Sequence, residues 1–307
     1  MMPDRPPIQE PTGESFAVAV IPDTQRYSER NPAAFEVQTR WLAQHREEEN
    51  IAFVFHEGDV VNAPEPEQFE RADRALTHLA ENDVPYLLAI GNHDYDNFAE
   101  RSADTFEEFF PTSRFADRPW WGDSFDGTAY NAYVRFKTLG DEYIALTLEP
   151  FPREAVVDWA EEVLETHSDH TGLLLTHGYL YRDGTPIDAG DKWDRTAYEV
   201  SGHNGDRLWE RFISRQPNLR AVFSGHVLTN GSGGTLSTDE NDFGERVHQL
   251  LTNYQSIGDG GRGYLRLVRF FPAADAITIE TYSPLLKRYH EDAAHHFRIG
   301  DAFGPGV

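Results

Sequence analysis

The chain has 307 residues and a formal net charge of −25, from 52 acidic against 27 basic residues, and it contains no cysteine. The lack of cysteine excludes disulfide bonds, thiolate metal ligands and cysteine nucleophiles. So acidic a surface repels the phosphates of nucleic acids and argues against nucleic-acid binding, and no apolar run approaches the ~20 residues that cross a bilayer.

Five short apolar segments, each bounded by turn residues, are predicted to be buried strands: residues 16–21, 51–55, 85–90, 172–175 and 219–223. Between them lie four segments with apolar residues at helical spacing: residues 31–49, 68–81, 154–167 and 206–215. The first of these begins at Asn31 and Pro32, a capping residue followed by a proline in the first turn. Strands that alternate with helices indicate a layered α/β fold.

The C-terminal third changes character. The segments 246–251, 264–271 and 276–282 are predicted strands joined by short turns, and 130–136 and 143–148 are two more that precede the third helix. Together they indicate a second, more antiparallel sheet packed against the first. We expect a disordered or extended segment at residues 1–14, one domain over residues 15–290 and a tail at residues 291–307, with solvated histidines near this tail at His290, His295 and His296.

Each of the five predicted buried strands is followed by an Asp, Asn or His. In chain order these residues are Asp23, Asp59, Asn92 (with His93 and Asp94), His177 and His226. Ligands of open α/β sheets bind outside the carboxyl ends of the strands, where these side chains would converge. Oxygen and imidazole donors suit a divalent first-row metal such as Mn, Fe or Zn better than Ca or Mg. Singly, each residue could simply end a strand in a turn, but their order and shared position predict a metal site.

These motifs resemble those of the calcineurin-like metallophosphoesterases. The pattern of that family is Asp-x-His, Gly-Asp-x-x-Asp/Asn, Gly-Asn-His-Asp/Glu, a later His and Gly-His-x-His. The residues of this chain that match the pattern are, in order, Asp23, Gly58-Asp59-x-x-Asn62, Gly91-Asn92-His93-Asp94, His177 and Gly225-His226. The resemblance implies a four-layer α/β/β/α sandwich of two mixed sheets. It also implies a metal-dependent hydrolase of phosphomonoesters or phosphodiesters, with a small-molecule phosphate ester as substrate.

The resemblance further implies a role for each matching residue. Two metal sites would be bridged by Asp59, one completed by Asn92, His177 and His226 and the other containing Asp23. A hydroxide held by the metals would attack phosphorus in line, because metal coordination lowers the pKa of bound water towards ~7. His93 would protonate the leaving oxygen or stabilise charge on the phosphoryl group, and Asp94 would orient His93.

Two positions depart from the family pattern. Gln25 stands where the pattern has the His of Asp-x-His, and Leu228 stands where it has the last His. Because a glutamine carbonyl is a weaker ligand than imidazole and leucine is none, we expect one tight metal site and one weak or exchangeable site at Asp23. One alternative is a catalytically degenerate scaffold that binds metal and recognises a protein partner, although binding needs no acid such as His93. Another is a metal-dependent hydrolase of carbon esters or amides.

Substrate contacts are predicted on either side of the metal site. Arg26 follows Asp23 and could pair with a phosphate, and His203 lies near the end of a long polar loop at residues 183–205, which its length marks as a functional candidate. Asn253-Tyr254-Gln255 also follows a predicted strand and could reach the edge of the site, but a surface or packing role is predicted for it.

The acidic composition carries a further expectation. The chain has only three lysines, and arginine supplies the other basic residues. Concentrated salt screens charges over a few ångströms, so an acidic, lysine-poor surface fits a halophilic protein. Residues 1–13 lack the apolar stretch of a secretory signal, which indicates a cytoplasmic protein or one whose leader has been removed.

Overall fold

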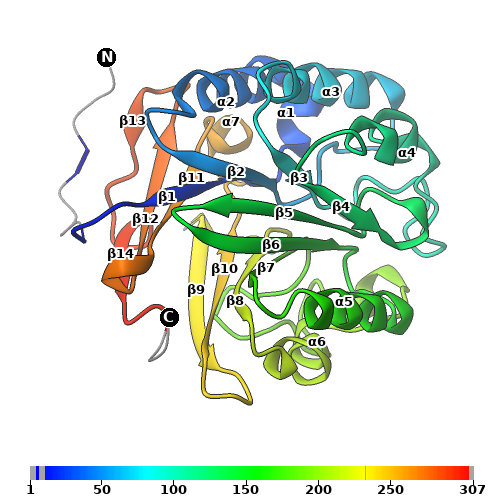
Figure 1. Ribbon diagram of the computed structural model, residues 1–307. Helices are drawn as coiled ribbons and strands as arrows, with labels where there is room; N and C mark the ends of the chain where they lie inside the picture. Colours follow the sequence, from blue (N-terminus) through cyan, green and yellow to red (C-terminus); the bar gives the residue numbers. More distant parts are fainter. Residues whose placement is uncertain (1–4, 7–10, 232, 304–307) are drawn as a thin grey trace.

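Two mixed sheets face each other, and helices cover the outer side of each, so the four-layer α/β/β/α sandwich expected from the resemblance is confirmed (Figure 1). The computed structural model describes residues 5–6, 11–231 and 233–303. Within these residues, none of the helices combines the length and the apolar character needed to cross a bilayer.

The first sheet is parallel on one side of β1 and antiparallel on the other. Its order is β13 (Arg288–Tyr289), β12 (Ala276–Ser283), β11 (Leu265–Phe271), β1 (Phe16–Ile21), β2 (Ile51–His56) and β3 (Tyr86–Leu88), and β14 (His296–Gly300) also pairs with β12. All six residues of β1 are apolar and buried, as expected for a central strand that is covered on both faces.

The second sheet contains a parallel centre flanked by antiparallel strands. Its order is β4 (Trp121–Ser124), β5 (Ala132–Thr138), β6 (Asp141–Leu148), β7 (Thr171–Thr176), β8 (Leu219–Ser224), β10 (Arg246–Thr252) and β9 (Gly234–Glu240). The strands β6, β7, β8 and β10 all run in the same direction, so their carboxyl ends lie at one edge of this sheet.

Helices form the two outer layers. Those on the first sheet are α1 (Gln25–Arg30), α2 (Pro32–His45), α3 (Pro66–Glu81) and α4 (Asp104–Phe109), with the short α7 (Gly258–Gly261) beside α1. Those on the second sheet are α5 (Glu154–Thr166) and α6 (Gly205–Arg211), seen at the bottom of Figure 1. Buried apolar residues such as Phe16, Phe55, Leu175 and Phe223 fill the space between the sheets.

The distribution of strands between the sheets corrects one prediction. The segments now seen as β11 and β12 were expected in a second sheet, but they extend the first sheet from β1, where Phe16 stacks on Phe270 with ring centroids 5.1 Å apart. Conversely, β7 and β8 belong to the second sheet, not the first. β11 pairs with the edge of β1 that β2 leaves free, and local sequence patterns do not reveal such a pairing.

The ends of the chain also differ from the expected boundaries. Residues 296–300, expected within a tail, form β14 and pair with β12 over its whole length, so this part belongs to the sheet. His295, expected to be solvated, is buried at 1% exposure. Of the N-terminal segment, residues 1–4 and 7–10 lie outside the described residues, while Arg5 forms ion pairs with the buried carboxylates of Glu49 and Glu280.

Candidate metal centre

The turns that carry the predicted ligands meet at one end of the sandwich. In each sheet the strands that precede them run parallel, so the turns after β1, β2 and β3 share one edge and those after β7 and β8 share another. Backbone hydrogen bonds join neighbouring turns: Thr24 N–H donates to the carbonyl of Asp59 at 3.1 Å, and Gly225 N–H to that of His177 at 3.0 Å. The site is therefore built from both sheets.

Two of the residues with predicted ligands, Asp59 and His226, have an unusual backbone conformation. Asp59 and His226 have φ angles of +49° and +65°, in the left-handed region that costs a non-glycine residue about 1 kcal/mol or more. Two glycines allow close approach beside them. A Cβ atom at Gly91 would lie 2.2 Å from Oδ1 of Asp59, and one at Gly225 would lie 2.2 Å from Oδ1 of Asp23. Strain of this kind is typical of functional sites.

Three possible ligand atoms surround Nε2 of His177 at nearly equal distances. Nε2 lies 3.3 Å from Oδ1 of Asp59, 3.2 Å from Oδ1 of Asn92 and 3.2 Å from Nδ1 of His226. Ligands bound about 2.0–2.1 Å from a tetrahedral cation such as zinc lie about 3.3 Å from one another. The distances from Nε2 of His177 to the other three atoms therefore fit a first-row divalent cation.

The tautomers of the two histidines are set by backbone carbonyls. Nδ1 of His177 donates to the carbonyl of Glu57 at 2.7 Å, and Nε2 of His226 donates to the carbonyl of Trp193 at 3.1 Å. A carbonyl oxygen can only accept, so in the neutral rings the opposite nitrogens are lone-pair acceptors. These two acceptors face each other at 3.2 Å. Their repulsion is relieved when a cation, or a proton, lies between them.

The electrostatics of the group agree with this geometry. Burial would lower the pKa of His177, but the carboxylate of Asp59 outweighs it and raises this pKa to about 9. Burial and the charge on His177 lower the pKa of His226 to about 3. The pKa of Asp59 is held below its usual range by His177, although burial alone would raise it. Without a metal, a proton on His177 thus supplies the positive charge that the buried carboxylate requires.

His93 lies next to the group and is only partly buried. Its backbone N–H donates to Oδ1 of Asp59 at 3.0 Å, and its ring Nδ1 donates to the carbonyl of Asn62 at 2.8 Å. The other ring nitrogen, Nε2, is therefore the one that can meet a ligand in its neutral form or donate a proton in its charged form.

The hydrogen bonds described for the Asp94 carboxylate come from backbone N–H groups and not from the ring of His93, which it was expected to orient. Its Oδ1 accepts the backbone N–H of Val61 at 2.9 Å, and its Oδ2 accepts that of Gly91 at 2.8 Å. The carboxylate thus joins the turn after β2 to the turn after β3. The ring of His93 is held by the carbonyl of Asn62.

Asp23 is held by side-chain amides. Its Oδ2 accepts from Nδ2 of Asn253 at 2.9 Å and from Nε2 of Gln255 at 3.0 Å, and its Oδ1 lies 3.3 Å from the backbone N–H of His226. Nε2 of Gln25 donates to Oδ2 of Asp59 at 2.8 Å. Asn253 and Gln255, for which a surface or packing role was predicted, thus lie in the site. The available signal was their position directly after a strand.

Two more buried groups beside the centre were not singled out from the sequence. His56 is neutral, because burial lowers its pKa to about 3; its Nδ1 accepts from Gly58 N–H at 3.2 Å and its Nε2 donates to Oγ1 of Thr24 at 2.9 Å. Glu57 is fully buried beside Asp23, and burial raises the pKa of its carboxyl well above the usual value. His56 ends β2 and Glu57 follows it, so both carried the same signal as Asp59, a position at the end of a buried strand.

The long polar loop at residues 183–205 reaches the centre, which supports a functional role for it. The carbonyl of Trp193 accepts from His226, and the hydroxyl of Tyr198 lies 3.4 Å from Nε2 of the same ring. Asp194 organises this part of the loop by capping the 3₁₀ turn Arg195–Tyr198. The loop therefore covers the His226 side of the centre.

The two predicted substrate contacts lie outside the cluster. Arg26 is on α1, and its guanidinium pairs with Glu29 at 3.1 Å. Nε2 of His203 donates to Oε2 of Glu154 on α5 at 2.9 Å, and the backbone N–H of His203 donates to the carbonyl of Pro152. The contacts described for His203 thus hold it against α5, so its expected position next to the substrate is not supported.

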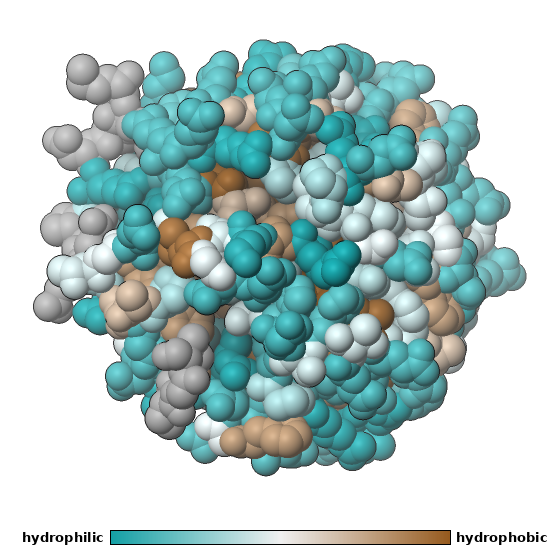
Figure 2. Space-filling view, in the orientation of Figure 1, coloured by the Kyte–Doolittle hydropathy of each residue, from teal (hydrophilic) through white to brown (hydrophobic). Residues whose placement is uncertain are grey.

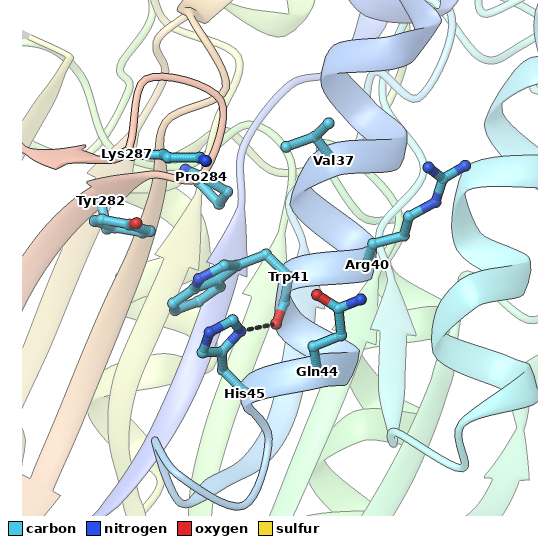
Figure 3. Close-up of a pocket in the computed structure, with 8 residues that line it drawn as sticks. All are labelled: Val37, Arg40, Trp41, Gln44, His45, Tyr282, Pro284 and Lys287. Atoms are coloured by element: carbon cyan, nitrogen blue, oxygen red, sulfur yellow. Dashed lines mark hydrogen bonds between the residues drawn. The ribbon is translucent and has the colours of Figure 1, made fainter. Parts of the chain in front are cut away.

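Two features elsewhere resemble sites but lack the required chemistry. His290, Asp292 and His295 could offer ligand atoms to a cation, but the guanidinium of Arg266 lies 3.4 Å from Nδ1 of His295 and opposes positive charge there. A hollow of about 320 Å³ beside α2 is shown in Figure 3. Its labelled side chains, among them Trp41 and Tyr282, include none of the predicted ligands.

Residues 16–230 match the family described as calcineurin-like phosphoesterase. The chain is 30% identical over 286 residues to the uncharacterized protein YvnB of Bacillus subtilis (strain 168). This match covers 90% of this chain and 20% of that protein. It is 26% identical over 191 residues to the serine/threonine-protein phosphatase CPPED1 of Rattus norvegicus, covering 59% of this chain and 55% of that protein.

The purple acid phosphatase PPD1 from yellow lupin (Lupinus luteus) seeds shares the fold, with a TM-score of 0.58 at 12% identity, covering 94% of this chain and 54% of that one. The chain thus spans about a fifth of the bacterial relative and about half of the rat and lupin proteins. Since the family match covers more than half of the sequence and the fold agrees with it, the chain belongs to the calcineurin-like phosphoesterase family.

Proposed function

We propose that this protein hydrolyses phosphomonoesters or phosphodiesters with a divalent cation held by Asp59, Asn92, His177 and His226. The observation that carries the proposal is that Nε2 of His177 and Nδ1 of His226 face each other at 3.2 Å. The other nitrogen of each ring is bonded to a backbone carbonyl, so the two facing nitrogens are acceptors in the neutral rings. Mn, Fe or Zn suits this mixture of oxygen and nitrogen ligands. Such a cation supplies Lewis acidity at phosphorus and lowers the pKa of bound water towards ~7.

The remaining chemistry falls to residues around the cation. We propose that His93 donates a proton to the leaving oxygen from Nε2, because the carbonyl of Asn62 holds its Nδ1–H and so fixes the direction of the ring. Arg26, one residue beyond Gln25 and 38% exposed, is proposed to exchange its pairing with Glu29 for a substrate phosphate. The strained turns and the carboxylate of Asp94 keep these groups at fixed positions.

We propose small-molecule esters as substrates. With 52 acidic residues against 27 basic ones, the surface repels the phosphate chain of a nucleic acid, whereas a compact ester needs only the local charge of the cation and Arg26. The proposed site opens beside Asn92 and His93, both of which are partly exposed.

The proposed activity predicts a defined pattern of turnover. Protein freed of metal by chelation and then supplied with Mn²⁺, Zn²⁺ or Fe²⁺ is expected to hydrolyse p-nitrophenyl phosphate or bis-p-nitrophenyl phosphate, and to lose this activity when the metal is removed again. Comparison of the two esters assigns the monoesterase or diesterase class, and elemental analysis of protein purified without chelator identifies the metal.

Two alternatives are separated by the same assay. Turnover of p-nitrophenyl acetate at a higher rate than of either phosphate would indicate a hydrolase of carbon esters. Tight metal binding without turnover of any ester would indicate a metal-binding scaffold that recognises a protein partner. The phosphatase proposal requires that activity depend on both added metal and His93.

We also propose that the acidic surface adapts the protein to concentrated salt. Figure 2 shows a face that is hydrophilic over most of its area, with small and scattered apolar patches. Carboxylates crowded on such a surface repel one another in dilute buffer, and molar salt screens this repulsion.

The melting temperature is therefore expected to rise steeply when KCl is increased from dilute buffer to the molar range. Relief of a few kcal/mol of repulsion corresponds to about 10 °C for a domain of this size. Calorimetry at increasing KCl tests this, with sucrose at equal osmolality as a control that stabilises without screening. A melting temperature that stays flat or falls with KCl would show that the acidic surface has no such role.

A further inference from the structure

Three side-chain amides donate hydrogen bonds to the two carboxylates of the centre. Asn253 and Gln255 both donate to Oδ2 of Asp23, and Gln25 donates to Oδ2 of Asp59. Asn253 is fully buried and Gln25 nearly so, so water does not compete for these hydrogen bonds. These contacts lie on the side of the centre where the family pattern has its two further histidines.

The orientation of the Asn253 amide is fixed by the backbone. Its Oδ1 accepts the backbone N–H of Gln255 at 3.0 Å. If the amide were reversed, its NH₂ group would face this N–H and its oxygen would face the carboxylate of Asp23, so that both contacts would become repulsive. Asn253 must therefore present N–H, not a ligand oxygen, to Asp23.

The two carboxylate oxygens of Asp59 lie on different sides of the centre: Oδ1 on the side of His177 and Oδ2 on the side of Gln25. Oδ1 lies 3.3 Å from Nε2 of His177, within the group of four possible ligand atoms. Oδ2 accepts from Gln25. Asp23 is similarly engaged, since Oδ2 accepts from the two amides and Oδ1 lies 3.3 Å from the backbone N–H of His226. On the second side of the centre, the carboxylate oxygens of Asp23 and Asp59 are thus occupied by N–H donors.

We infer that Asn253, Gln255 and Gln25 take the place of a second cation, so that the centre holds a single cation at the four atoms grouped around His177. Asp23 then acts as a positioning residue. It joins the turn after β1 to the turn after β8 and to the segment that follows β10, and so fixes the backbone that carries His226. The inference rests on the proposed function only for the presence of the first cation.

An exchange of amide for carboxylate at position 253 tests this directly. Asn253→Asp keeps the shape of the side chain, and one oxygen can still accept the N–H of Gln255. The other oxygen replaces the NH₂ group and faces Oδ2 of Asp23 across the 2.9 Å of the present bond. Two carboxylate oxygens at that distance require a proton or a cation between them, and alkaline buffer with Mn²⁺ favours the cation.

The chain offers a matched control in Asn131. This residue is also fully buried; its Oδ1 accepts the backbone N–H of Glu149 at 2.8 Å and its Nδ2 donates to the Glu149 carboxylate at 3.1 Å. Arg153 pairs with that carboxylate at 2.8 Å, so an added charge there meets a guanidinium. Asn131→Asp loses the same kind of hydrogen bond without creating the need for a cation.

The measurement is the number of metal ions per chain after loading with Mn²⁺ and dialysis against a weak chelator, supported by electron paramagnetic resonance, which distinguishes an isolated Mn²⁺ from a coupled pair. We expect one ion in the parent and in Asn131→Asp, and two in Asn253→Asp. If Asn253→Asp does not fold, Gln255→Glu, at a partly exposed position, makes the same exchange against the same oxygen of Asp23.

Each other result decides against the inference. Two ions in the parent would show that the amides turn to ligate a second metal. One ion in the folded carboxylate variants would show that the amides do not stand in for a cation. No ion in any variant would overturn the proposed function as well. The first two results would leave the proposed function intact, because the first cation is bound in both.

Discussion

Replacement of Asp59 by alanine is expected to remove the bound cation and the phosphoesterase activity together. Asp59 supplies the carboxylate oxygen of the four possible ligand atoms, so the substitution removes a ligand and leaves Asp23 as the remaining carboxylate of the group Asp23, Asp59 and His177. We expect metal content to fall from one ion to a small fraction per chain and turnover to fall to background. Elemental analysis after dialysis and an assay on the same sample measure both.

A second variant and a surface control make this result interpretable. Because φ at position 59 is +49°, alanine is strained there, while asparagine tolerates the left-handed region and keeps the shape of the side chain. Asp59→Asn should therefore fold and still lose the metal. Asp158→Ala, on the exposed face of α5 in an ion pair with Arg211, should retain both metal and activity. Undiminished metal in folded Asp59→Asn would contradict the proposed centre.

The sequence predicted the elements of this fold well wherever a strand is buried on both faces. The segment FAVAVI of β1 is a continuous apolar run between turn residues, and its predicted bounds, residues 16–21, are those observed. The types of residue at the site could also be predicted, because each proposed ligand lies within four residues of the end of such a strand. Neither inference needs any knowledge of which strands are neighbours.

Neighbouring strands could not be predicted, and this concealed two residues of the site. The segments that form β10 and β11 both mix apolar and polar residues, yet β10 pairs parallel with β8 while β11 pairs antiparallel with β1. The sequence placed the segment of β10 in an antiparallel sheet, and the direction of a strand in such a sheet does not tell which of its ends lies at the site. Once it is parallel to β8, with Leu251 opposite Ser224, Asn253 must lie next to the turn that carries His226.

The hydrogen-bond partners of the site residues could not be predicted from the sequence either. The family resemblance implied that Asp94 orients His93, but the hydrogen bonds described for its carboxylate come from the backbone N–H groups of Val61 and Gly91. His203 lies in the loop that covers the centre, but Glu154 on α5 is its partner. Such choices depend on distances of a few ångströms between segments far apart in sequence, and these become defined only when both sheets have formed.

Replacement of His93 by alanine is expected to separate catalysis from metal binding. The side chain of His93 contributes none of the four atoms grouped around His177, so metal content should remain at the parental value. Turnover should fall, because removal of a general acid typically costs ~10²–10⁴-fold. The loss should be largest for alkyl phosphates, whose leaving oxygen needs a proton, and smaller for p-nitrophenyl phosphate, whose leaving group departs as a stable anion.

This dependence on the leaving group distinguishes the two possible roles of the ring. If His93 instead stabilises charge on the phosphoryl oxygens, the alanine variant should lose a similar factor with every ester, because those oxygens are common to all of them. His78→Ala, on α3 beside Arg40, removes a histidine remote from these contacts and should change neither metal content nor turnover. Parental rates for alkyl phosphates in His93→Ala would show that the proton comes from another group. A steep dependence on the leaving group, with metal content unchanged, would identify Nε2 of His93 as its source.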